Sequence, residues 1–448
     1  MSFPKYSAYK DSGIEWLGSV PSEWCIAPIK AIASCNDEVL PETTDGDTVI
    51  EYVEISGVEE GRGITETATL SFSAAPSRAR RVIRHGDVLI STVRTYLRAI
   101  ATVAHPPDNL IASTGFAAIR PRQVEPRFLG YLLHCEYLMS EVIARSVGVS
   151  YPAINASELM RLKGPLPSVK EQRAIATFLD RETAKIDALV EEQKRLIELL
   201  KEKRQAVISQ AVTKALDPNV PMKDSGVEWL GKVPAHWTVK ALKHAIARGT
   251  SISYGIVQPG ESLEDGVPFI QTTNMTNGEF DLEVLQRTSR EIASAYPRSC
   301  LTGGEVLLGI RASIGACHVV PKHLAGCNLS RGVARIVCDD DLQSDFLVCY
   351  LSTDEVARYW QLAKQGSTFN EVSIETVREL LVLVPPLAEQ QEISQSVKAL
   401  RAQLEALVAE AEAAMELLRE RRTALISAAV TGKIDVRGLV PQPEVATA

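Results

Sequence analysis

The 448-residue chain lacks long apolar segments and closely paired cysteines. No uninterrupted apolar run approaches the roughly 18 residues that a membrane-spanning helix needs. The first ten residues, MSFPKYSAYK, contain no apolar core of a secretion signal. The eight cysteines form no C-x-x-C pair, which favours reduced thiols over disulfides. We therefore expect a cytoplasmic protein.

Metal-binding and catalytic motifs are also missing. The nearest approach to a metal cluster is Cys317-His318 with His323 and Cys327, and nothing in this spacing directs four side chains to one point. Residues 226–233, GVEWLGKV, nearly form a phosphate-binding loop, but Val233 stands where Ser or Thr must reach magnesium. The chain has no G-x-G-x-x-G, no H-E-x-x-H, and no Asn or Asp followed by two prolines and an aromatic residue. We predict no catalytic residue, no metal site and no cofactor on this chain.

Charge of one sign is not in large excess, since 48 basic and 56 acidic residues give a net charge of −8. This balance argues weakly against a partner held by bulk charge, because long-range attraction to phosphate favours basic proteins. The composition, 45% hydrophobic and 23% charged, is typical of a globular chain. At roughly 150 residues per domain, the length predicts about three units.

An internal repeat determines the organisation. Lys10–Trp24 recurs as Lys223–Trp237, 213 residues later, with eleven of fifteen residues identical. Glu171-Gln172 recurs as Glu389-Gln390, and 206–213 recurs as 424–431, both at a spacing of 218. The chain is therefore a tandem duplication, and each copy has a short strap, a globular module and a long apolar-periodic segment.

The long segments predict two helices with a seven-residue repeat. The predicted apolar seams are Ile175, Leu179, Ile186, Leu189, Leu196, Leu200, Val207 and Ala211 in the first copy, and Ile393, Val397, Leu400, Leu404, Leu407, Ala411, Leu418 and Leu425 in the second. About 43 residues at 1.5 Å each give a rod of roughly 65 Å. One stripe must be buried against the other, and a single chain achieves this with antiparallel helices and one module at each end. Pairing between separate chains is the alternative.

The predicted fold class is α+β: two similar α+β modules, separated by two long helices that form an antiparallel coiled coil, with a pseudo-twofold duplication. Short β-branched or aromatic runs separated by turn signals support strands in each module. The expected boundaries are a strap at 1–24, a module at 25–166, a helix at 167–216, a second strap at 217–237, a second module at 238–384, a helix at 385–434 and a tail at 435–448.

Charge is unevenly distributed within the modules. Residues 36–66 hold ten acidic residues and one arginine, whereas 76–98 hold six arginines and one acid. In the second module, residues 285–335 hold seven basic and two acidic residues. The planar fork of arginine binds phosphate or the guanine edge bidentately, so these clusters suit a DNA groove. The alternative is a solvated surface neutralised by the acidic stretch.

Each copy contains a strap, a variable module, a proline-containing segment with Glu-Gln-x-x-Ile (171–175 and 389–393) and a long helix. This order, occurring twice, resembles the specificity subunit of type I restriction–modification systems. Residues 86–91, 113–116, 206–209 and 424–427 add to this resemblance, which covers essentially the whole chain. It implies two target-recognition domains, each reading one half of a split DNA sequence. It also implies two copies of a DNA adenine methyltransferase subunit and ATP-dependent restriction and translocation subunits as partners. S-adenosylmethionine, ATP and Mg²⁺ would then belong to those partners.

The candidate DNA-binding residues are arginines and polar or aromatic residues expected on loops near strand ends. They are Arg78, Arg81, Arg84, Arg94, Tyr96, Arg98 and Tyr151 in the first module, and Asn274, Arg311, Ser313, Ser330, Arg331, Thr368 and Asn370 in the second. We assign Trp16, Trp24, Trp229 and Trp237 to packing of the straps. Three alternatives remain: a coiled-coil assembly scaffold without DNA binding, the recognition part of a different methyltransferase–nuclease system, and an enzyme that is itself a methyltransferase or nuclease.

Overall fold

The computed structural model describes residues 3–276, 278, 280–364 and 371–439. The chain divides into two compact units, one formed by residues 1–193 with 412–448 and the other by residues 194–411. Each unit contains one strap, one module and parts of both long helices. Of the helices that the described residues form, none is both long and apolar enough to cross a membrane.

Each repeated strap folds as a small antiparallel hairpin. In the first unit, β1 (Tyr9–Asp11) pairs with β2 (Ser19–Pro21), and in the second, β15 (Met222–Asp224) pairs with β16 (Lys232–Pro234). The turns close in the same way, because the Asp11 and Asp224 carboxylates accept hydrogen bonds from the backbone two residues later, at 2.9 and 2.8 Å. The near-identity of the two sequences is therefore explained by one local structure.

The strap tryptophans do not all pack as predicted. Trp24 and Trp237 are buried, and Trp229 is partly buried with its ring 5.5 Å from that of Tyr359. Trp16, which corresponds to Trp229, is 64% exposed. The assignment of Trp16 to packing is therefore wrong, because the first unit places no equivalent ring against it among the described residues.

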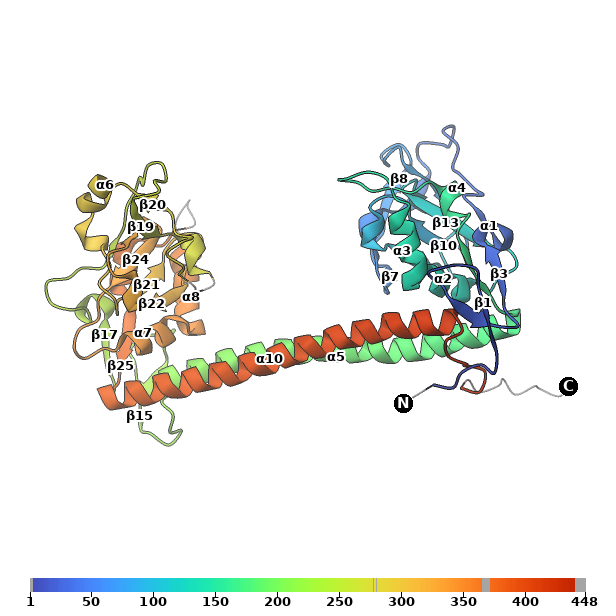
Figure 1. Ribbon diagram of the computed structural model, residues 1–448. Helices are drawn as coiled ribbons and strands as arrows, with labels where there is room; N and C mark the ends of the chain where they lie inside the picture. Colours follow the sequence, from blue (N-terminus) through green and yellow to red (C-terminus); the bar gives the residue numbers. More distant parts are fainter. Residues whose placement is uncertain (1–2, 277, 279, 365–370, 440–448) are drawn as a thin grey trace. The chain divides into compact units, whose positions relative to one another are not determined.

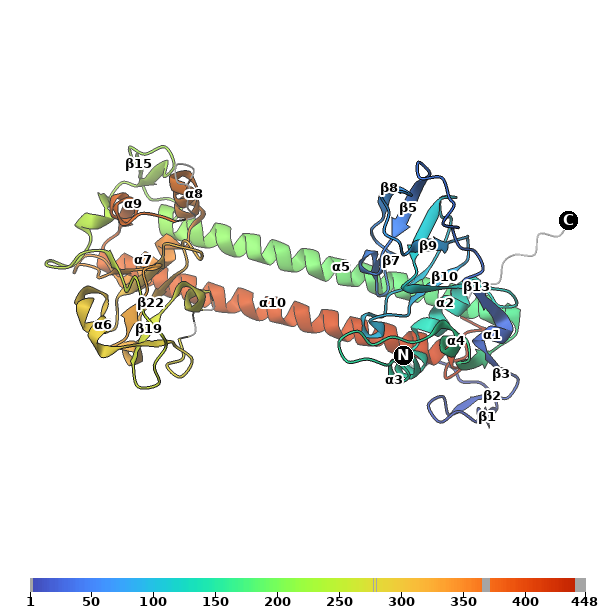
Figure 2. The ribbon, with the colours of Figure 1, turned by 90° about the horizontal axis from the view of Figure 1, so that it is seen from above.

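The module of the first unit is built on two four-stranded sheets (Figures 1 and 2). The first has the order β11–β10–β13–β4, and its strands are Ile100–Thr102, Val88–Ser91, Phe116–Pro121 and Ala33–Cys35. The second has the order β8–β5–β12–β9, with strands Ala68–Ser71, Val49–Val53, Leu110–Ser113 and Ala79–Val82. The remaining elements are β3 (Cys25–Pro28), paired with β14 (Lys163–Leu166), β6 (Val58–Glu59), paired with β7 (Gly63–Ile64), and the helices α1 (Ile29–Ile32), α2 (Pro126–His134), α3 (Glu136–Ala144) and α4 (Ala156–Leu159).

Strand β10 shows why this sequence forms the centre of the module. Its residues Val88, Leu89 and Ile90 are all fully buried. Successive side chains point to opposite faces of a strand, so Val88 and Ile90 join a core that includes α2, whereas Leu89 joins a second core with Phe116. An apolar run without alternation therefore marks a strand that is covered on both faces.

The module of the second unit repeats this plan with shorter strands. One sheet has the order β18–β24–β21–β22, with strands Ser253–Tyr254, Val333–Ile336, Val306–Gly309 and Cys317–Val319, and another has the order β20–β19–β23, with strands Arg287–Thr288, Val267–Ile270 and Asn328–Leu329. A further pair joins β17 (Thr238–Ala241) to β25 (Leu381–Val384). The α-helices are α6 (Arg290–Ala295), α7 (Ser344–Leu351), α8 (Asp354–Lys364) and α9 (Ile374–Glu379).

The two long helices are α5 (Val169–Lys214) and α10 (Leu387–Val430). In the first unit, Ile175 and Leu179 of α5 share a core with Leu425 of α10, and Arg422 contacts Asp187 at 2.9 Å. The second unit likewise combines the last part of α5 with the first part of α10, and Ile208, Ala211 and Val212 share a core with Ile393 and Val397. The first part of one helix thus meets the last part of the other, which confirms the predicted antiparallel pairing within one chain.

The seam of α5 departs from the predicted register between Ile186 and Ala211, which are both buried as predicted, and the predicted Val207 is 37% exposed. Leu189 and Leu196 are 45% and 42% exposed, whereas Ile197 and Ile208 are buried. A straight helix has 3.6 residues per turn, so a strict seven-residue repeat drifts around its surface, and the neighbouring Ile197 takes the buried position. In α10 most of the predicted seam is buried, but Leu407 is 41% exposed. The buried seam residues are Ile393, Val397, Leu404, Ala411 and Leu425.

A buried glutamine at the start of each long helix ties it to its module. Gln172 donates to the carbonyl oxygen of Pro167 at 2.8 Å and accepts from the backbone of Glu125 at 2.8 Å. Gln390 donates to Pro385 at 2.8 Å, donates to Asp341 at 2.7 Å and accepts from Gln343 at 2.8 Å. Both side chains are buried. The repeated Glu-Gln pair is therefore a structural joint.

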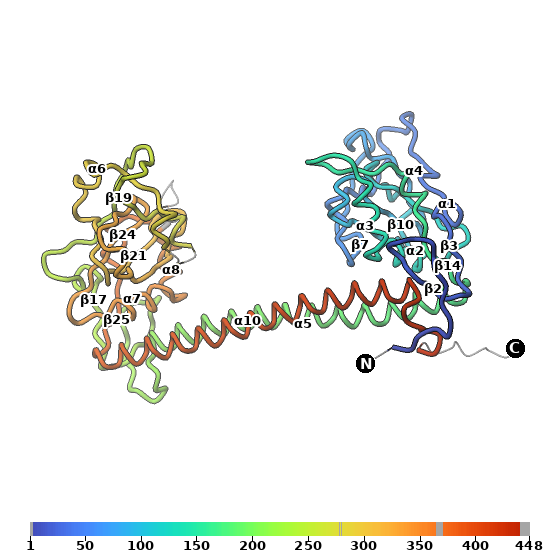
Figure 3. Tube along the Cα trace, in the orientation of Figure 1, coloured from blue at the N-terminus to red at the C-terminus, as the bar shows by residue number. Residues whose placement is uncertain are grey.

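The preceding glutamates connect the helices to the straps. Trp24 Nε1 donates to Glu171 at 3.2 Å, and His236 Nε2 lies 2.8 Å from a carboxylate oxygen of Glu389. In the first unit the N-terminal segment also runs along the end of α10, since Tyr9 donates to the Gly432 carbonyl oxygen at 3.1 Å and Asp435 N donates to Pro4 at 2.7 Å (Figure 3). Each strap is thus held against the helices of its own unit.

Candidate nucleic-acid interface

The chain that follows the central strand of each module forms the same turn in both units. In the first, Ile154 N donates to Thr92 O at 2.9 Å, and Val93 forms an antiparallel bridge with Ala153. In the second, Val372 N donates to Ile310 O at 2.9 Å, and Arg311 forms the equivalent bridge with Glu371. The corresponding positions are 218 residues apart, as in the helix repeats. We call this arrangement the bridged turn.

A left-handed residue follows the bridge in both units. Arg94 has φ 53° and Ala312 has φ 51°. L-residues rarely adopt this conformation, so its occurrence at both positions indicates a shared backbone frame. The side chains at the two positions differ completely, and the frame can therefore present different chemistry in each module.

In the first module the bridged turn presents a cation and two aromatic rings. The guanidinium carbon of Arg94 lies 4.8 Å from the centre of the Tyr151 ring, and Arg94 N donates to Pro152 O at 2.8 Å. The Tyr151 and Tyr96 side chains are 61% and 53% exposed. Among the described residues no carboxylate forms an ion pair with Arg94. Of the seven candidates in this module, Arg94 and Tyr151 therefore form an exposed pair with an available arginine fork, and Tyr96 is exposed two residues after Arg94.

The other arginine candidates of the first module lie beside acidic residues. Arg78 pairs with Glu54, Arg84 pairs with Glu38 at 2.7 Å, and Arg98 pairs with Glu136 at 2.6 Å, with Glu60 at 3.6 Å. Glu38, Glu54 and Glu60 belong to the acidic stretch 36–66, as the alternative interpretation of that stretch expected. Arg81, on β9, is partly buried, and its Nε has no hydrogen-bond partner among the described residues.

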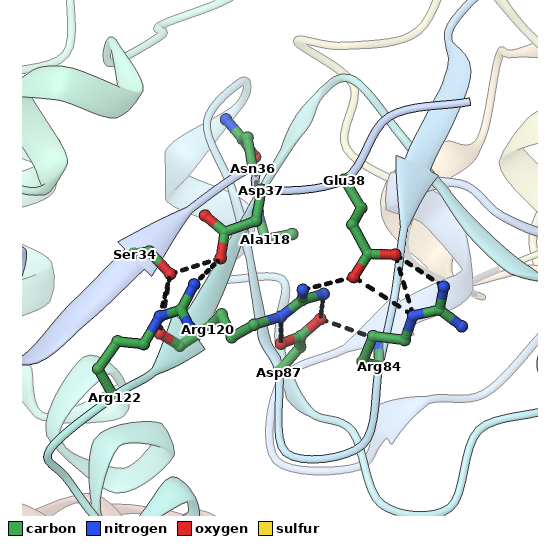
Figure 4. Close-up of polar contacts among 9 residues, drawn as sticks. All are labelled: Ser34, Asn36, Asp37, Glu38, Arg84, Asp87, Ala118, Arg120 and Arg122. Carbon is green, nitrogen blue, oxygen red and sulfur yellow. Dashed lines mark hydrogen bonds and ion pairs between the residues drawn. The ribbon is translucent and has the colours of Figure 1, made fainter. Parts of the chain in front are cut away.

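Arg84 belongs to a four-residue charge network (Figure 4). Asp87 is 1% exposed and accepts two hydrogen bonds from Arg120, both at 2.9 Å, and one from Arg84 N at 2.8 Å. Arg120 also pairs with Glu38 at 2.6 Å. Hydrogen bonds from Arg84 and then Arg120 lower the pKa of Glu38 to about 2. Glu38 therefore carries its charge at neutral pH and balances two arginines.

The second module places a buried acid at the matching position. Glu305 is 2% exposed, accepts from Thr302 N at 2.7 Å and pairs with Arg335 at 2.8 Å. Burial raises the pKa of Glu305, but the hydrogen bonds from Thr302 and Arg335 outweigh it and bring the pKa down to about 2. Both modules thus share a buried acid with two partners: the backbone N–H three residues earlier and an arginine on the neighbouring strand.

Several candidates of the second module lie on segments that contact one another. Asn274 accepts from Gln271 N at 2.9 Å at the start of a 3-10 helix, Thr272–Met275, and Ser313 donates to Thr272 O at 3.2 Å. Arg311 pairs with Glu371.

Ser330 and Arg331 lie between β23 and β24, where Ser330 N donates to Ile270 O and Arg331 N donates to Ile256 O, both at 2.8 Å. The Arg331 side chain is exposed, and none of the described carboxylates pairs with it. Thr368 and Asn370 lie outside the described residues. Arg331 is thus the exposed basic candidate of this module.

Apolar residues that the sequence did not single out lie beside Tyr151. Val149 is 100% exposed and Val147 is 81% exposed. Two valines flanking Gly148 in a turn were the available signal, because turns ordinarily carry polar residues. Charge and hydrogen-bonding capacity were the criteria for candidates, so both were missed.

The possible metal-binding residues Cys317, His318, His323 and Cys327 have separate partners. His318 Nε2 lies 2.8 Å from Met275 O and His323 Nε2 lies 3.3 Å from Phe280 O. Both cysteines are buried, and burial raises the pKa of Cys317 to about 11. Among the described residues, no group of three or more His, Cys, Asp or Glu side chains could hold a metal ion.

Comparison with known proteins connects this duplicated frame to one family. The family model described as type I restriction modification DNA specificity domain matches residues 39–199 and 248–413. The Type I restriction enzyme EcoBI specificity subunit of Escherichia coli is 25% identical over 311 residues, which cover 68% of this chain and 65% of that protein. The putative MjaX specificity subunit of Methanocaldococcus jannaschii is 23% identical over 437 residues, which cover 94% of this chain and 96% of that protein.

Solved structures show the same relationship. A chain from a structure that describes complex assembly and conformational transition of a type I R-M system aligns with a TM-score of 0.68 at 26% identity, over 92% of this chain and 98% of that chain. The HsdS subunit of Thermoanaerobacter tengcongensis aligns with a TM-score of 0.54 at 25% identity, over the same shares. The duplicated modules, the paired long helices and the match to both segments of the family model show that this chain belongs to the type I restriction–modification specificity family.

Proposed function

We propose that this chain is the specificity subunit of a type I restriction–modification complex and recognises a DNA target in two parts. Residues 25–166 and 238–384 act as the two target-recognition domains, and each reads one half-site. The relatives named as specificity subunits support this role. The reaction itself is assigned to partner subunits, and this chain supplies recognition and assembly.

The observation that carries the proposal is the bridged turn, which keeps its backbone in both modules while its side chains change. Arg94 in one module corresponds to Ala312 in the other, and the bridge Val93–Ala153 corresponds to Arg311–Glu371. A recognition element needs this combination, because a constant frame sets the approach to DNA and variable side chains select the bases. Two unlike sets of side chains predict two unlike half-sites.

Arg94 and Tyr151 are the proposed centre of recognition in the first module. The stacked ring holds the guanidinium in one orientation, which suits a bidentate contact with phosphate or with O6 and N7 of guanine. Tyr96 adds a second exposed ring next to it in sequence. The predicted counterpart in the second module is Arg331, which has an exposed side chain and lies in the segment that connects β23 to β24.

The ion-paired arginines have a different consequence. Arg78, Arg84 and Arg98 are neutralised by acids of their own module, and the whole chain carries a net charge of −8. Attraction to DNA by bulk charge is correspondingly small. We therefore expect the isolated chain to bind DNA weakly and the complex with its partners to bind strongly.

The proposed partners are two copies of a DNA adenine methyltransferase subunit, together with ATP-dependent restriction and translocation subunits. S-adenosylmethionine, ATP and Mg²⁺ bind to these partners in this proposal. Two straps with the same hairpin, each attached through a different residue to the glutamate at the start of a long helix, offer two similar docking surfaces, which favours two copies of one partner.

Methylation mapping tests the proposal directly. The chain is co-expressed with the proposed methylating subunits, and methylated adenines are located across the host DNA. We expect one split target with two defined half-sites. Replacement of Arg94 by Ala weakens methylation or relaxes specificity at one half-site by roughly 5- to 150-fold, since a bidentate base contact contributes about 1–3 kcal/mol.

Two controls make the result decisive. Arg161 is an exposed arginine of the same module that pairs with Glu158 at 2.5 Å, and Arg161→Ala is expected to leave methylation unchanged. Arg331→Ala affects the other half-site. Transfer of methyl groups from S-adenosylmethionine to DNA by the purified chain alone would contradict the assignment of the reaction to partners.

A further inference from the structure

The segment Val147–Ala153 presents an apolar tip that packing of the module does not explain. Val149 is 100% exposed and Val147 is 81% exposed. Gly148 has φ 117°, and a Cβ there would lie 3.0 Å from the backbone oxygen of Tyr151, so the turn is tight and requires glycine. Val147, Val149 and the 61% exposed Tyr151 gather in this one turn, and an exposed apolar cluster of this kind points to an interaction surface.

The base of this tip is firmly held. Val147 and Ala153 exchange backbone hydrogen bonds of 2.9 and 3.0 Å. Ser146 contacts Thr95 through their hydroxyl groups at 2.8 Å and donates to the Val142 carbonyl oxygen at 2.7 Å. The tip is therefore presented by a short antiparallel rung that is anchored to α3 and to the turn after β10.

The chemistry beside the tip identifies its partner as DNA. Arg94 stacks on Tyr151 at 4.8 Å, and no described carboxylate pairs with this arginine. A surface that combines an available arginine fork, exposed aromatic rings and a narrow apolar tip fits a phosphate-lined groove with base edges at its floor. The major groove is about 12 Å wide and admits a two-stranded ribbon, and the segment here is a turn closed by the single bridge between Val147 and Ala153.

We propose that Val149 enters the major groove of the half-site read by the first module and contacts the 5-methyl group of a thymine. This inference rests on the proposed function. The thymine methyl is the apolar group that base-pair edges expose in the major groove, whereas the other groups there are hydrogen-bond donors and acceptors. Val149 is thus a specificity-determining residue, and Arg94 sets the register in which it meets the base.

Removal of single methyl groups from the DNA tests this contact. The complex with its methylating subunits is titrated with duplexes of the mapped target in which each thymine of that half-site is replaced, one at a time, by deoxyuridine. This replacement removes only the methyl group. For the unmodified protein we expect about fourfold weaker binding at one position, the effect of one buried methyl group.

Val149→Ala removes the protein side of the same contact. Because Val149→Ala removes two methyl-sized groups, we expect it to bind the natural target about 4- to 15-fold less tightly and to lose its sensitivity to deoxyuridine at that one position. Val49, a 54% exposed valine at the start of β5 in the same module, supplies the matched control, and Val49→Ala keeps the original deoxyuridine pattern. Thermal unfolding of both variants should match that of the unmodified chain, because neither side chain is buried.

Several results would overturn the inference. One is a half-site that contains no thymine, and another is deoxyuridine sensitivity that Val149→Ala leaves unchanged. The third is loss of a methylating subunit from the complex when Val149 is substituted, which would make the tip a protein-docking surface. Failure of the proposed function would differ, because then the unmodified complex would show no target preference and Arg94→Ala would have no effect.

Discussion

Replacing the buried Gln390 by methionine tests how firmly a module is joined to its long helix. Methionine nearly preserves the side-chain volume, so the change removes hydrogen bonds without opening a large cavity. Three backbone groups lose their partner, namely the N–H of Gln343 and the carbonyl oxygens of Asp341 and Pro385. The equivalent change of Gln172 affects two groups, Glu125 N–H and the Pro167 carbonyl oxygen.

These contacts set the expected magnitudes. A net hydrogen bond contributes about 1 kcal/mol to stability, so Gln390→Met should reduce the free energy of unfolding by about 3 kcal/mol and Gln172→Met by about 2 kcal/mol. For cooperative units of this size, 1 kcal/mol corresponds to roughly 2–4 °C in Tm. The first variant should therefore lower the Tm of its own unit by roughly 6–12 °C.

The assay follows thermal and urea unfolding of the full chain by far-ultraviolet circular dichroism. Hydrogen exchange of peptides around Glu125 and Gln343 then identifies the unit that is destabilised. Gln403 lies on α10 with an exposed side chain, and Gln403→Met is the control, with a change below about 0.5 kcal/mol. A stability of Gln390→Met equal to that of this control would refute the view that the glutamine is the joint.

Three further changes have expected outcomes. The pKa of Glu305 is lowered from 4.5 to about 2, so its charge stabilises the fold above pH 4.5 and this effect is lost as the pH falls toward 2. Acid titration should show that the stability difference between the original chain and Glu305→Gln shrinks across that window. Glu38→Ala leaves Arg84 and Arg120 with one acid fewer. If one DNA phosphate takes the place of the carboxylate, the slope of log binding constant against log salt concentration should steepen by about 0.9 for non-specific DNA, as measured by fluorescence anisotropy. Seven residues inserted into both α5 and α10 lengthen each helix by about 10.5 Å, and methylation mapping should show a spacer longer by roughly 3 base pairs with unchanged half-sites; altered half-sites would contradict the role of the helices as a ruler.

The repeated and periodic features of this protein were accessible from its sequence. The duplication was visible in Lys10–Trp24 and its copy, and the two long helices were visible in their apolar repeat. Periodicity is a local property, so it identifies a helix and its apolar face without knowledge of the fold. The same pattern left the choice between adjacent residues open, and only packing selected Ile197 over Leu196.

The sequence also identified Arg94, Tyr96 and Tyr151 as candidates, and it offered two interpretations of the neighbouring arginines. Only the tertiary structure decided which acid lies beside which arginine, because Glu54 and Arg78 are 24 residues apart and Glu38 and Arg84 are 46 residues apart. Strand order brings such residues together, and strand order follows from non-local packing. The same is true of Val149. Two valines beside Gly148 marked an unusual turn in the sequence, but exposure is a property of the folded surface, and only the structure showed that nothing in the module covers Val149.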